Sequence, residues 1–529
     1  MRPVSLPRVP RPIRKFVLHP KSLWRAFSQL APTPVAALLE WKPGTEVGDV
    51  VVNGFIRSVR HMKSQSFVSL GDGSSLAPLQ ALVPTDRSEG LTVGAAVRLK
   101  GSWVSSPGAG QSHELHANEV DILGPSDAKS FPIQKKYQTP EYLRTLPHLR
   151  PRTPYNSVLL RLRSAAIASL TQFFAQRLFT QTHPPIITSS DCEGAGEVFT
   201  VSSANQTASP SDDEASGSFF RSPKYLTVST QLHLEALAQS VGNVWTLSPT
   251  FRAEKSDTSR HLSEFYMLEA EMSFVDDLSV IMDLAEDMLR SLSTNLYETK
   301  LAQEVLSRSG QAGSDLEPAD RVRQRWEGIM QTSWPRITYT EAIKILAPKA
   351  DMFTHKPTWG ASLQAEHEKY IAQHVGGSRP VFVTDYPRDI KAFYMRQSAA
   401  ITDPGIRTGT GADGASGSTV ECFDLLVPDL CEIAGGSMRE HRLGNLVDAM
   451  QLHGMAAPGL DGAYSDPERM AETSTSRDSL DWYVDLRRWG CPPHGGFGLG
   501  FDRLLCYLSG VQTIRDVVAF PRWHGRCDC

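Results

Sequence analysis

The sequence predicts an α+β protein in which a small β-barrel precedes a larger domain of mixed helices and strands. The chain has 529 residues, too many for one ordinary hydrophobic core, so at least two domains are expected. Short strand patterns crowd into residues 47–125, whereas residues 155–529 combine helical and strand spacing. With 40% apolar and 21% charged residues, the composition is typical of a globular protein.

Residues 1–40 form a basic N-terminal segment. No acidic residue precedes Glu40. The basic residues there are Arg2, Arg8, Arg11, Arg14, Lys15, Lys21 and Arg25. Basic, acid-free N-termini are typical of mitochondrial import signals, because the membrane potential draws cations inward. We therefore expect a targeting segment and a place in the mitochondrial matrix. A basic arm that touches RNA, and a cytoplasmic protein, are the alternatives.

Residues 47–125 carry five strand patterns, at 50–56, 67–70, 79–83, 96–101 and 119–123. Five short strands in such a stretch predict a closed barrel of the OB type. These barrels bind single-stranded nucleic acid through stacked aromatic rings and a basic groove. Because the net charge is −4, any such contact needs a local basic patch. Phe67 is the candidate stacking residue, Arg57 a candidate cation, and Gln80 a candidate base contact. The alternative places Phe67 in the barrel core.

Residues 126–154 are proline-rich and basic, and we interpret them as a linker. A helix is expected next. Apolar residues recur at helical spacing: Leu159, Leu162, Ala166, Leu170, Phe173 and Leu178. The prolines at 184–185 end this pattern.

Polar tracts at 201–218 and 402–418 predict exposed insertions. No apolar run is long enough to span a bilayer. The seven cysteines are scattered without a CxxC pair, which indicates reduced thiols.

Two segments carry chemistry. Strand patterns at 244–247 and 265–274 flank a polar turn and predict a hairpin. Alternate residues of a strand share a face, so Arg252 and Glu254 should point the same way and hold a phosphate beside an amino-purine edge. A solvated ion pair is the alternative. Near the C-terminus, the alternate glycines of 496–500 leave bare backbone for a ligand, and Arg503 follows at the start of an apolar helix, which favours an anion.

Together these segments resemble class II aminoacyl-tRNA synthetases. Residues 252–265 are similar to motif 2 of that class, 498–503 to motif 3, and the helix ending near Pro185 to motif 1, which forms the homodimer interface. The resemblance covers about 47–522. It implies a catalytic domain over 155–529, built on an antiparallel sheet flanked by helices. A barrel before this domain is the arrangement of the aspartate, asparagine and lysine subgroup, in which the barrel binds the tRNA anticodon through residues such as Phe67, Gln80 and Arg57.

Within the subgroup the asparaginyl enzymes are most similar. Residues 187–197 and 229–235 resemble their substrate loops, although Thr230 stands where the family usually has glycine. Aspartyl enzymes carry a lysine at the position of Leu234. Without that cation a buried carboxylate has no partner, so a neutral amide becomes the better ligand. The expected partner is tRNA(Asn), and the expected substrate is asparagine.

The resemblance also implies the role of each site residue. Arg252 would hold the α-phosphate of ATP, Glu254 would read the adenine amino group, and Phe265 and Arg503 would cover the two adenine faces. The remaining nucleotide contacts would be His261, Glu264 and Gly500. Asparagine would be bound by Glu193, Gln231, His233, Glu235 and Arg439. The acids Asp424 and Glu432 would hold Mg²⁺, since hard oxygens suit this ion. Arg252 and Arg503 would be the catalytic pair.

Three alternatives stay open. An aspartyl or non-discriminating enzyme conflicts with Leu234. A tRNA-independent asparagine synthetase predicts that the barrel is lost. A non-catalytic RNA-binding paralogue predicts damage among Arg252, Glu254 and Arg503, or at the acidic pair, and the sequence shows none.

Overall fold

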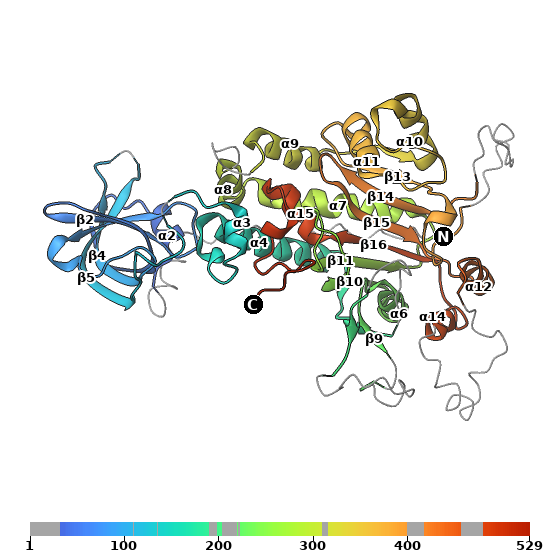
Figure 1. Cartoon of the computed structure of the whole chain (residues 1–529), viewed down its shortest axis with the longest axis horizontal. Helices are drawn as coiled ribbons and strands as arrows, with labels where there is room; N and C mark the ends of the chain where they lie inside the picture. Colours follow the sequence, from blue (N-terminus) through green and yellow to red (C-terminus); the bar gives the residue numbers. More distant parts are fainter. Residues whose placement is uncertain are drawn as a thin grey trace, which may run out of the picture. The chain divides into compact units, whose positions relative to one another are not determined.

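The computed structural model describes residues 32–108, 110–134, 136–189, 198–203, 219–220, 223–308, 316–398, 417–455 and 480–529 (Figure 1). The chain divides into two compact units, residues 1–138 and 139–529. Most of the predicted targeting segment, and most of both predicted insertions, lie outside the described residues.

The first unit is the predicted closed barrel. Its strands are β1 (Val47–His61), β2 (Gln65–Gly71), β3 (Leu79–Pro84), β4 (Ala96–Ser105) and β5 (His113–Gly124). They close in the order β1-β2-β3-β5-β4, with helix α2 (Val35–Glu40) preceding them. Alternation along β2 sends Val68 and Leu70 into the barrel core, so Phe67 lies on the outer face and is half-buried. Phe67 is therefore not a core residue.

The second unit begins inside the stretch that the sequence predicts as a linker. Helix α3 (Pro140–Arg144) and a 3₁₀ turn at Arg150–Arg152 pack on the C-terminal part of this unit. Nη1 of Arg144 lies 2.9 Å from Oδ1 of Asp516, and Nη1 of the buried Arg150 lies 3.4 Å from the same atom. These ion pairs attach residues 139–152 to the second unit.

An eight-stranded sheet organises the second unit (Figure 1). Its order is β12 (Arg336–Thr338), β13 (Val381–Thr384), β14 (Cys422–Val427), β15 (Cys431–Met438), β16 (His494–Gly500), β11 (Glu264–Ser273), β10 (Asn243–Phe251) and β6 (Thr180–Gln181). The six central strands are antiparallel, as expected, but the two edge strands β12 and β6 pair in parallel. A small second sheet joins β7 (Ile187–Thr188), β9 (Lys224–Leu226) and β8 (Thr200–Val201).

Helices α4 (Pro154–Gln176), α7 (Leu278–Tyr297) and α15 (Phe501–Ser509) pack on one another and on β11, β15 and β16. The buried Asp502 of α15 ties this layer together, because it accepts hydrogen bonds from Arg163 of α4 and from the backbone of Tyr266. The predicted helix ends earlier than expected: Leu178 has a positive φ of 61°, so α4 stops at Gln176.

Helix α4 is long and apolar enough to cross a bilayer, which corrects the expectation that no such run exists. Its apolar side packs against α7 and α8 (Lys300–Arg308), and Arg161 pairs with Glu304 of α8. Helix α9 (Ala319–Met330) packs against α7 and α8 in the same layer. One side of α4 is therefore buried within this unit.

The remaining helices are α6 (Gln231–Val241), α10 (Tyr339–Leu346), α11 (Ala365–Ile371), α12 (Leu443–Leu452) and α14 (Asp481–Asp485). Helix α6 packs on β10 and β11. It brings the 229–235 segment beside the centre of the sheet, where the candidate site lies.

Candidate active site

Strand β11 supplies one wall of the site through alternate side chains. Phe265 and Met267 line a small cavity, and Met267, Glu269 and Glu271 line a larger adjoining one. The intervening Leu268 points to the helical layer and is fully buried. The two-residue period of a strand therefore places four consecutive odd-numbered residues in the site.

The same rule explains Glu264. As an even-numbered residue it does not line either cavity; instead it pairs with Phe251 and forms a bridge to Arg522. Glu264 therefore does not line the cavity in which we expected it to contact the nucleotide.

Glycines form the floor of the site. Glu269 on β11 pairs with Gly498 on β16, Gly498 with Gly435 on β15, and Gly435 with Asp424 on β14. Glu269 and Asp424 thus lie at the two ends of this cross-strand row, and the two positions between them are glycines without side chains. One row further on, a Cβ at Gly496 would lie 2.1 Å from Oε2 of Glu271, so only glycine fits there. Of the three alternate glycines, Gly496 is the one at which a side chain is excluded, because a Cβ at Gly498 or Gly500 would come no closer than 3.2 Å to its neighbours.

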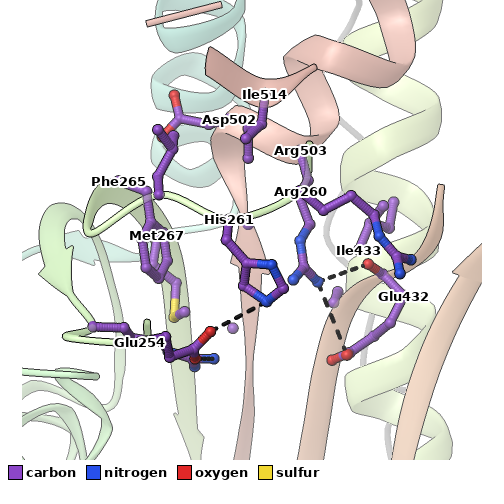
Figure 2. Close-up of a pocket in the computed structure, with 15 residues that line it drawn as sticks. Glu254, Arg260, His261, Phe265, Met267, Glu432, Ile433, Asp502, Arg503 and Ile514 are labelled. Carbon is purple, nitrogen blue, oxygen red and sulfur yellow. Dashed lines mark hydrogen bonds and ion pairs between the residues drawn. The ribbon is translucent and has the colours of Figure 1, made fainter. Parts of the chain in front are cut away.

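The small cavity, of about 130 Å³, gathers the predicted nucleotide residues (Figure 2). Arg252, Glu254, His261, Phe265, Gly500 and Arg503 all line it. Nη1 of Arg252 lies 3.8 Å from Oε1 of Glu254, which agrees with the predicted shared face. The guanidinium carbon of Arg252 also lies 5.7 Å from the Phe265 ring centroid. A cation, an acid and an aromatic face thus meet at one end of the groove.

His261 and Arg503 complete this end. Nε2 of His261 lies 3.2 Å from Oε2 of Glu254 (Figure 2). Burial lowers the pKa of His261, although Glu254 opposes the shift. Gly500 caps α15, and Nη1 of Arg503 donates to the carbonyl oxygen of Glu432 at 3.0 Å. Arg260, to which the sequence analysis gave no role, also lines the cavity.

The larger cavity, of about 570 Å³, holds the predicted amino-acid residues Gln231 and Arg439 together with Leu234. Glu269 forms part of its wall and is held by Thr230, whose backbone N–H lies 3.0 Å from Oε2. The Thr230 and Ser229 hydroxyls donate to the same carboxylate. Burial raises the pKa of Glu269, and these donors oppose that rise. The threonine that departs from the family pattern thus stabilises an acid of the cavity.

Arg439 is paired inside this cavity. Its Nη2 lies 3.0 Å from Oε2 of Glu271, its Nε lies 3.1 Å from Oε1, and both side chains are buried. Burial raises the pKa of Glu271, although Arg439 opposes this, and Glu271 with Glu235 raises the pKa of Arg439 despite its burial. The guanidinium therefore faces the cavity as half of an ion pair and not as an isolated cation.

Glu235 does not line either cavity, and its predicted contact with the substrate amide is not supported. Oε1 accepts from Gln231 and Tyr483 at 3.0 Å each. Oε2 accepts from Arg487 at 2.7 Å and lies 3.0 Å from Nε2 of His494. Although burial opposes the charge, Arg487 and His494 hold the pKa of Glu235 well below its usual range. Both carboxylate oxygens are thus occupied by protein donors.

His233 also lies away from the cavities. Its ring centroid is 5.3 Å from that of Trp482, and burial lowers its pKa. Glu193 lies outside the described residues. Among the described residues, Glu235, Glu271 and His494 come close enough to share a metal ion. Arg487 and Arg439 already neutralise the two carboxylates, however, so we interpret this group as a salt-bridge network.

Asp424 and Glu432 converge over Gly435. A Cβ at Gly435 would lie 3.5 Å from Oδ1 of Asp424 and 3.4 Å from Oε1 of Glu432, so the missing side chain leaves a space flanked by both acids. Two carboxylates around an open space fit a hard cation such as Mg²⁺. Lys391, which the sequence analysis did not single out, pairs with Asp424.

On the barrel, the outer face around Phe67 is polar. Phe67 pairs with Arg60 and Leu82, and Gln80 pairs with Ser69. Nε2 of Gln80 donates to Oε2 of Glu114 at 2.9 Å, and Glu114 is buried. Arg57 donates to the carbonyl oxygens of Ser75 and Leu76 at 3.2 and 2.8 Å, so its guanidinium holds a loop of the barrel.

Six residues of these networks are not predicted by any sequence motif: Glu269, Glu271, Glu114, Lys391, Arg487 and His494. For Glu269 and Glu271 the signal was present, because the strand period that begins at Phe265 leads directly to them. The others carry no local signal: each is one charged residue in an ordinary segment.

Comparisons with known proteins relate this chain to one enzyme family. Residues 139–524 match the family described as tRNA synthetases class II (D, K and N). The mitochondrial asparagine–tRNA ligase of Saccharomyces cerevisiae is 41% identical over 92% of this chain and 95% of that protein. The asparagine–tRNA ligase of Geotalea uraniireducens is 41% identical over 92% and 97%. The asparaginyl-tRNA synthetase of Pyrococcus horikoshii, solved with asparaginyl-adenylate, has a TM-score of 0.74 at 26% identity, covering 94% of this chain and 99% of that one.

Proposed function

The chain belongs to the class II tRNA synthetases (D, K and N), and within them to the asparagine–tRNA ligases, and we infer that it activates asparagine with ATP and transfers it to tRNA(Asn). The reaction needs no protein nucleophile. The asparagine carboxylate attacks the α-phosphate and pyrophosphate leaves; a ribose hydroxyl of the tRNA then attacks the adenylate carbonyl and AMP leaves. Catalysis therefore depends on positioning and on charge stabilisation.

The small cavity supports the nucleotide roles. Arg252 would hold the α-phosphate and offset the charge that grows on it. Phe265, beside the Arg252 guanidinium, would stack on one adenine face, and Arg503 would cover the other. Glu254 would accept from the adenine amino group. His261, with Arg503, would meet the terminal phosphate.

The larger cavity supports asparagine as the amino acid, and one observation carries this assignment. Leu234 and the Arg439–Glu271 ion pair line the same cavity, so these described residues offer the substrate side chain an apolar contact and a cation that an acid already pairs. The Arg439 guanidinium would donate to the amide carbonyl. Gln231 and Glu269 would bind the substrate ammonium, together with Glu193. Glu235 would act indirectly, by holding Gln231 and lying 3.9 Å from Arg439.

Asp424 and Glu432 would hold Mg²⁺, which neutralises triphosphate oxygens when it is bound. The open space over Gly435 supports this role. The barrel would bind the anticodon through Phe67 and Gln80, whereas Arg57 would shape the neighbouring loop.

We further propose a homodimer that forms through α4. Leu160 on α4 is 39% exposed, and Leu178 just beyond its end is 86% exposed, which supports an apolar contact surface. Size-exclusion chromatography with light scattering tests this proposal. We expect the wild type to have twice the mass of one chain, and Leu178→Glu to have the mass of one chain. A monomeric wild type would contradict the proposed homodimer.

The proposed location is the mitochondrial matrix. The acid-free basic N-terminal segment and the similarity to a mitochondrial yeast enzyme support it. Residues 1–39 fused to a fluorescent protein should reach mitochondria. A diffuse cytosolic signal would favour the cytoplasm.

Pyrophosphate exchange with each of the twenty amino acids tests the function itself. Asparagine should drive exchange far above aspartate. Equal exchange with both would indicate a non-discriminating enzyme. Exchange with neither, in a protein that binds tRNA, would indicate a non-catalytic paralogue.

A further inference from the structure

Lys391 occupies an unusual place beside the candidate metal ligands. Its Nζ lies 2.9 Å from Oδ1 and 2.8 Å from Oδ2 of Asp424, so the ammonium contacts both carboxylate oxygens. The same Nζ lies 4.0 Å from the centroid of the Tyr386 ring. Only 18% of the Lys391 side chain is exposed. The ammonium is therefore held between an acid and an aromatic face inside the large cavity.

This placement changes what Asp424 offers to a metal ion. A carboxylate whose two oxygens both contact an ammonium presents little free negative charge, and the ammonium repels a second cation. The other candidate ligand is also near a cation, since Oε2 of Glu432 lies 4.0 Å from Nη1 of Arg503. Each acid of the pair thus has a protein cation as its partner.

The triphosphate of ATP would offer both cations new acceptors. Lys391 and Arg503 line the same groove as the α-phosphate residue Arg252, so neither must leave the site to reach a bound nucleotide. When the Lys391 ammonium contacts phosphate oxygens instead, both carboxylate oxygens of Asp424 become available to a metal ion.

We propose that Lys391 is a positioning residue that acts as the resident counter-ion of Asp424, and that it keeps the acidic pair from binding a free divalent cation until a nucleotide takes over its ammonium. The proposal rests on the metal role proposed above for Asp424 and Glu432. The proposal predicts that the divalent cation binds together with the nucleotide. Without nucleotide, the enzyme should have a low affinity for the free ion.

The test is Mn²⁺ binding by the full chain without nucleotide, followed by the electron paramagnetic resonance signal of free Mn²⁺. Lys391→Met removes the ammonium and should bind free Mn²⁺ about tenfold or more tightly than the wild type, the size expected for losing one nearby charge. Lys391→Arg keeps a cation and is the matched control, with affinity close to that of the wild type. In the presence of a non-hydrolysable ATP analogue, the difference between wild type and Lys391→Met should shrink. Equal or weaker Mn²⁺ binding by Lys391→Met would overturn the proposal.

A second variant, Lys391→Gln, tests the proposal if Lys391→Met does not fold. Lys391→Gln can still donate to Asp424 but carries no charge, and it too should bind free Mn²⁺ more tightly. Wild-type affinity in a folded Lys391→Gln protein would also overturn the proposal. Asp424→Asn separates the two hypotheses: if it leaves nucleotide-dependent Mn²⁺ binding unchanged, the proposed metal role of Asp424 itself fails.

Discussion

Nη2 of Arg487 lies 2.7 Å from Oε2 of Glu235, and neither side chain has any exposed surface. The two residues are 252 positions apart in the chain, yet they form the centre of a buried network that also holds His494 and Tyr483. Because Glu235 lies 3.9 Å from Arg439, the network extends to the Arg439–Glu271 ion pair that lines the larger cavity.

Arg487→Met should destabilise the protein strongly. It leaves the buried Glu235 charge without its main partner, and breaking such a pair costs about 3–5 kcal/mol. Urea unfolding of the second unit measures this loss. The double variant Glu235→Gln/Arg487→Met removes both charges and should recover much of it. No recovery would show that the two residues are not coupled.

The pH dependence of stability should report on His494. Burial opposes its charge, but Cys491 and Glu235 raise the pKa of His494 to about 10, whereas the unfolded value is about 6.5. A raised folded pKa gives stability that is complete below pH 6.5 and is lost as the pH rises towards 10. The difference in unfolding free energy between wild type and His494→Gln should therefore narrow from pH 6.5 to 10. A difference independent of pH would contradict this assignment.

Leu234→Lys should weaken asparagine exchange and raise exchange with aspartate. Leu234 is almost fully buried and lines the amino-acid cavity, so a lysine there adds a cation that pairs with a carboxylate substrate. Leu234→Met keeps an apolar side chain and should preserve the preference for asparagine. Unchanged selectivity in a folded Leu234→Lys enzyme would exclude a role for this position.

Arg252→Lys should lower the rate of adenylate formation by about 10²–10³-fold, the usual cost of one preorganised donor at the reacting group. Lysine keeps the charge but loses the planar fork that can hold two phosphate oxygens. ATP affinity should change much less, because Glu254, Phe265 and Arg503 remain. Single-turnover adenylation measures the effect. Arg522→Lys, outside both cavities, is the control, and a normal rate for Arg252→Lys would rule out the proposed contact.

Phe67→Ala should cost about 1–3 kcal/mol of tRNA affinity through lost base stacking. Phe67 lies on the outer face of the barrel, so its removal should leave the fold intact and pyrophosphate exchange without tRNA unchanged. Val68→Ala, one residue on and in the core, should instead destabilise the barrel. If both variants bind tRNA like the wild type, the stacking role is wrong.

The local patterns predicted much of the fold and which residues line the small cavity. Five strand patterns indicated the barrel, and the hairpin and the alternate glycines indicated the two halves of the groove. Arg252, Glu254, His261, Phe265 and Arg503 lie together as expected. Glu264 was placed in the site although the same two-residue period, applied strictly, points it to the opposite face.

The sequence by itself determined the helices and strands and which of their side chains share a face, because both depend on the periodicity of neighbouring residues. Only the tertiary structure decided which charges meet. Cross-strand register aligns Glu269, Gly498, Gly435 and Asp424 in one row, and no local pattern contains that register. The partners of Glu235 and Asp424 depend on it too, since a buried charge is satisfied by whichever donor packing brings within hydrogen-bond distance.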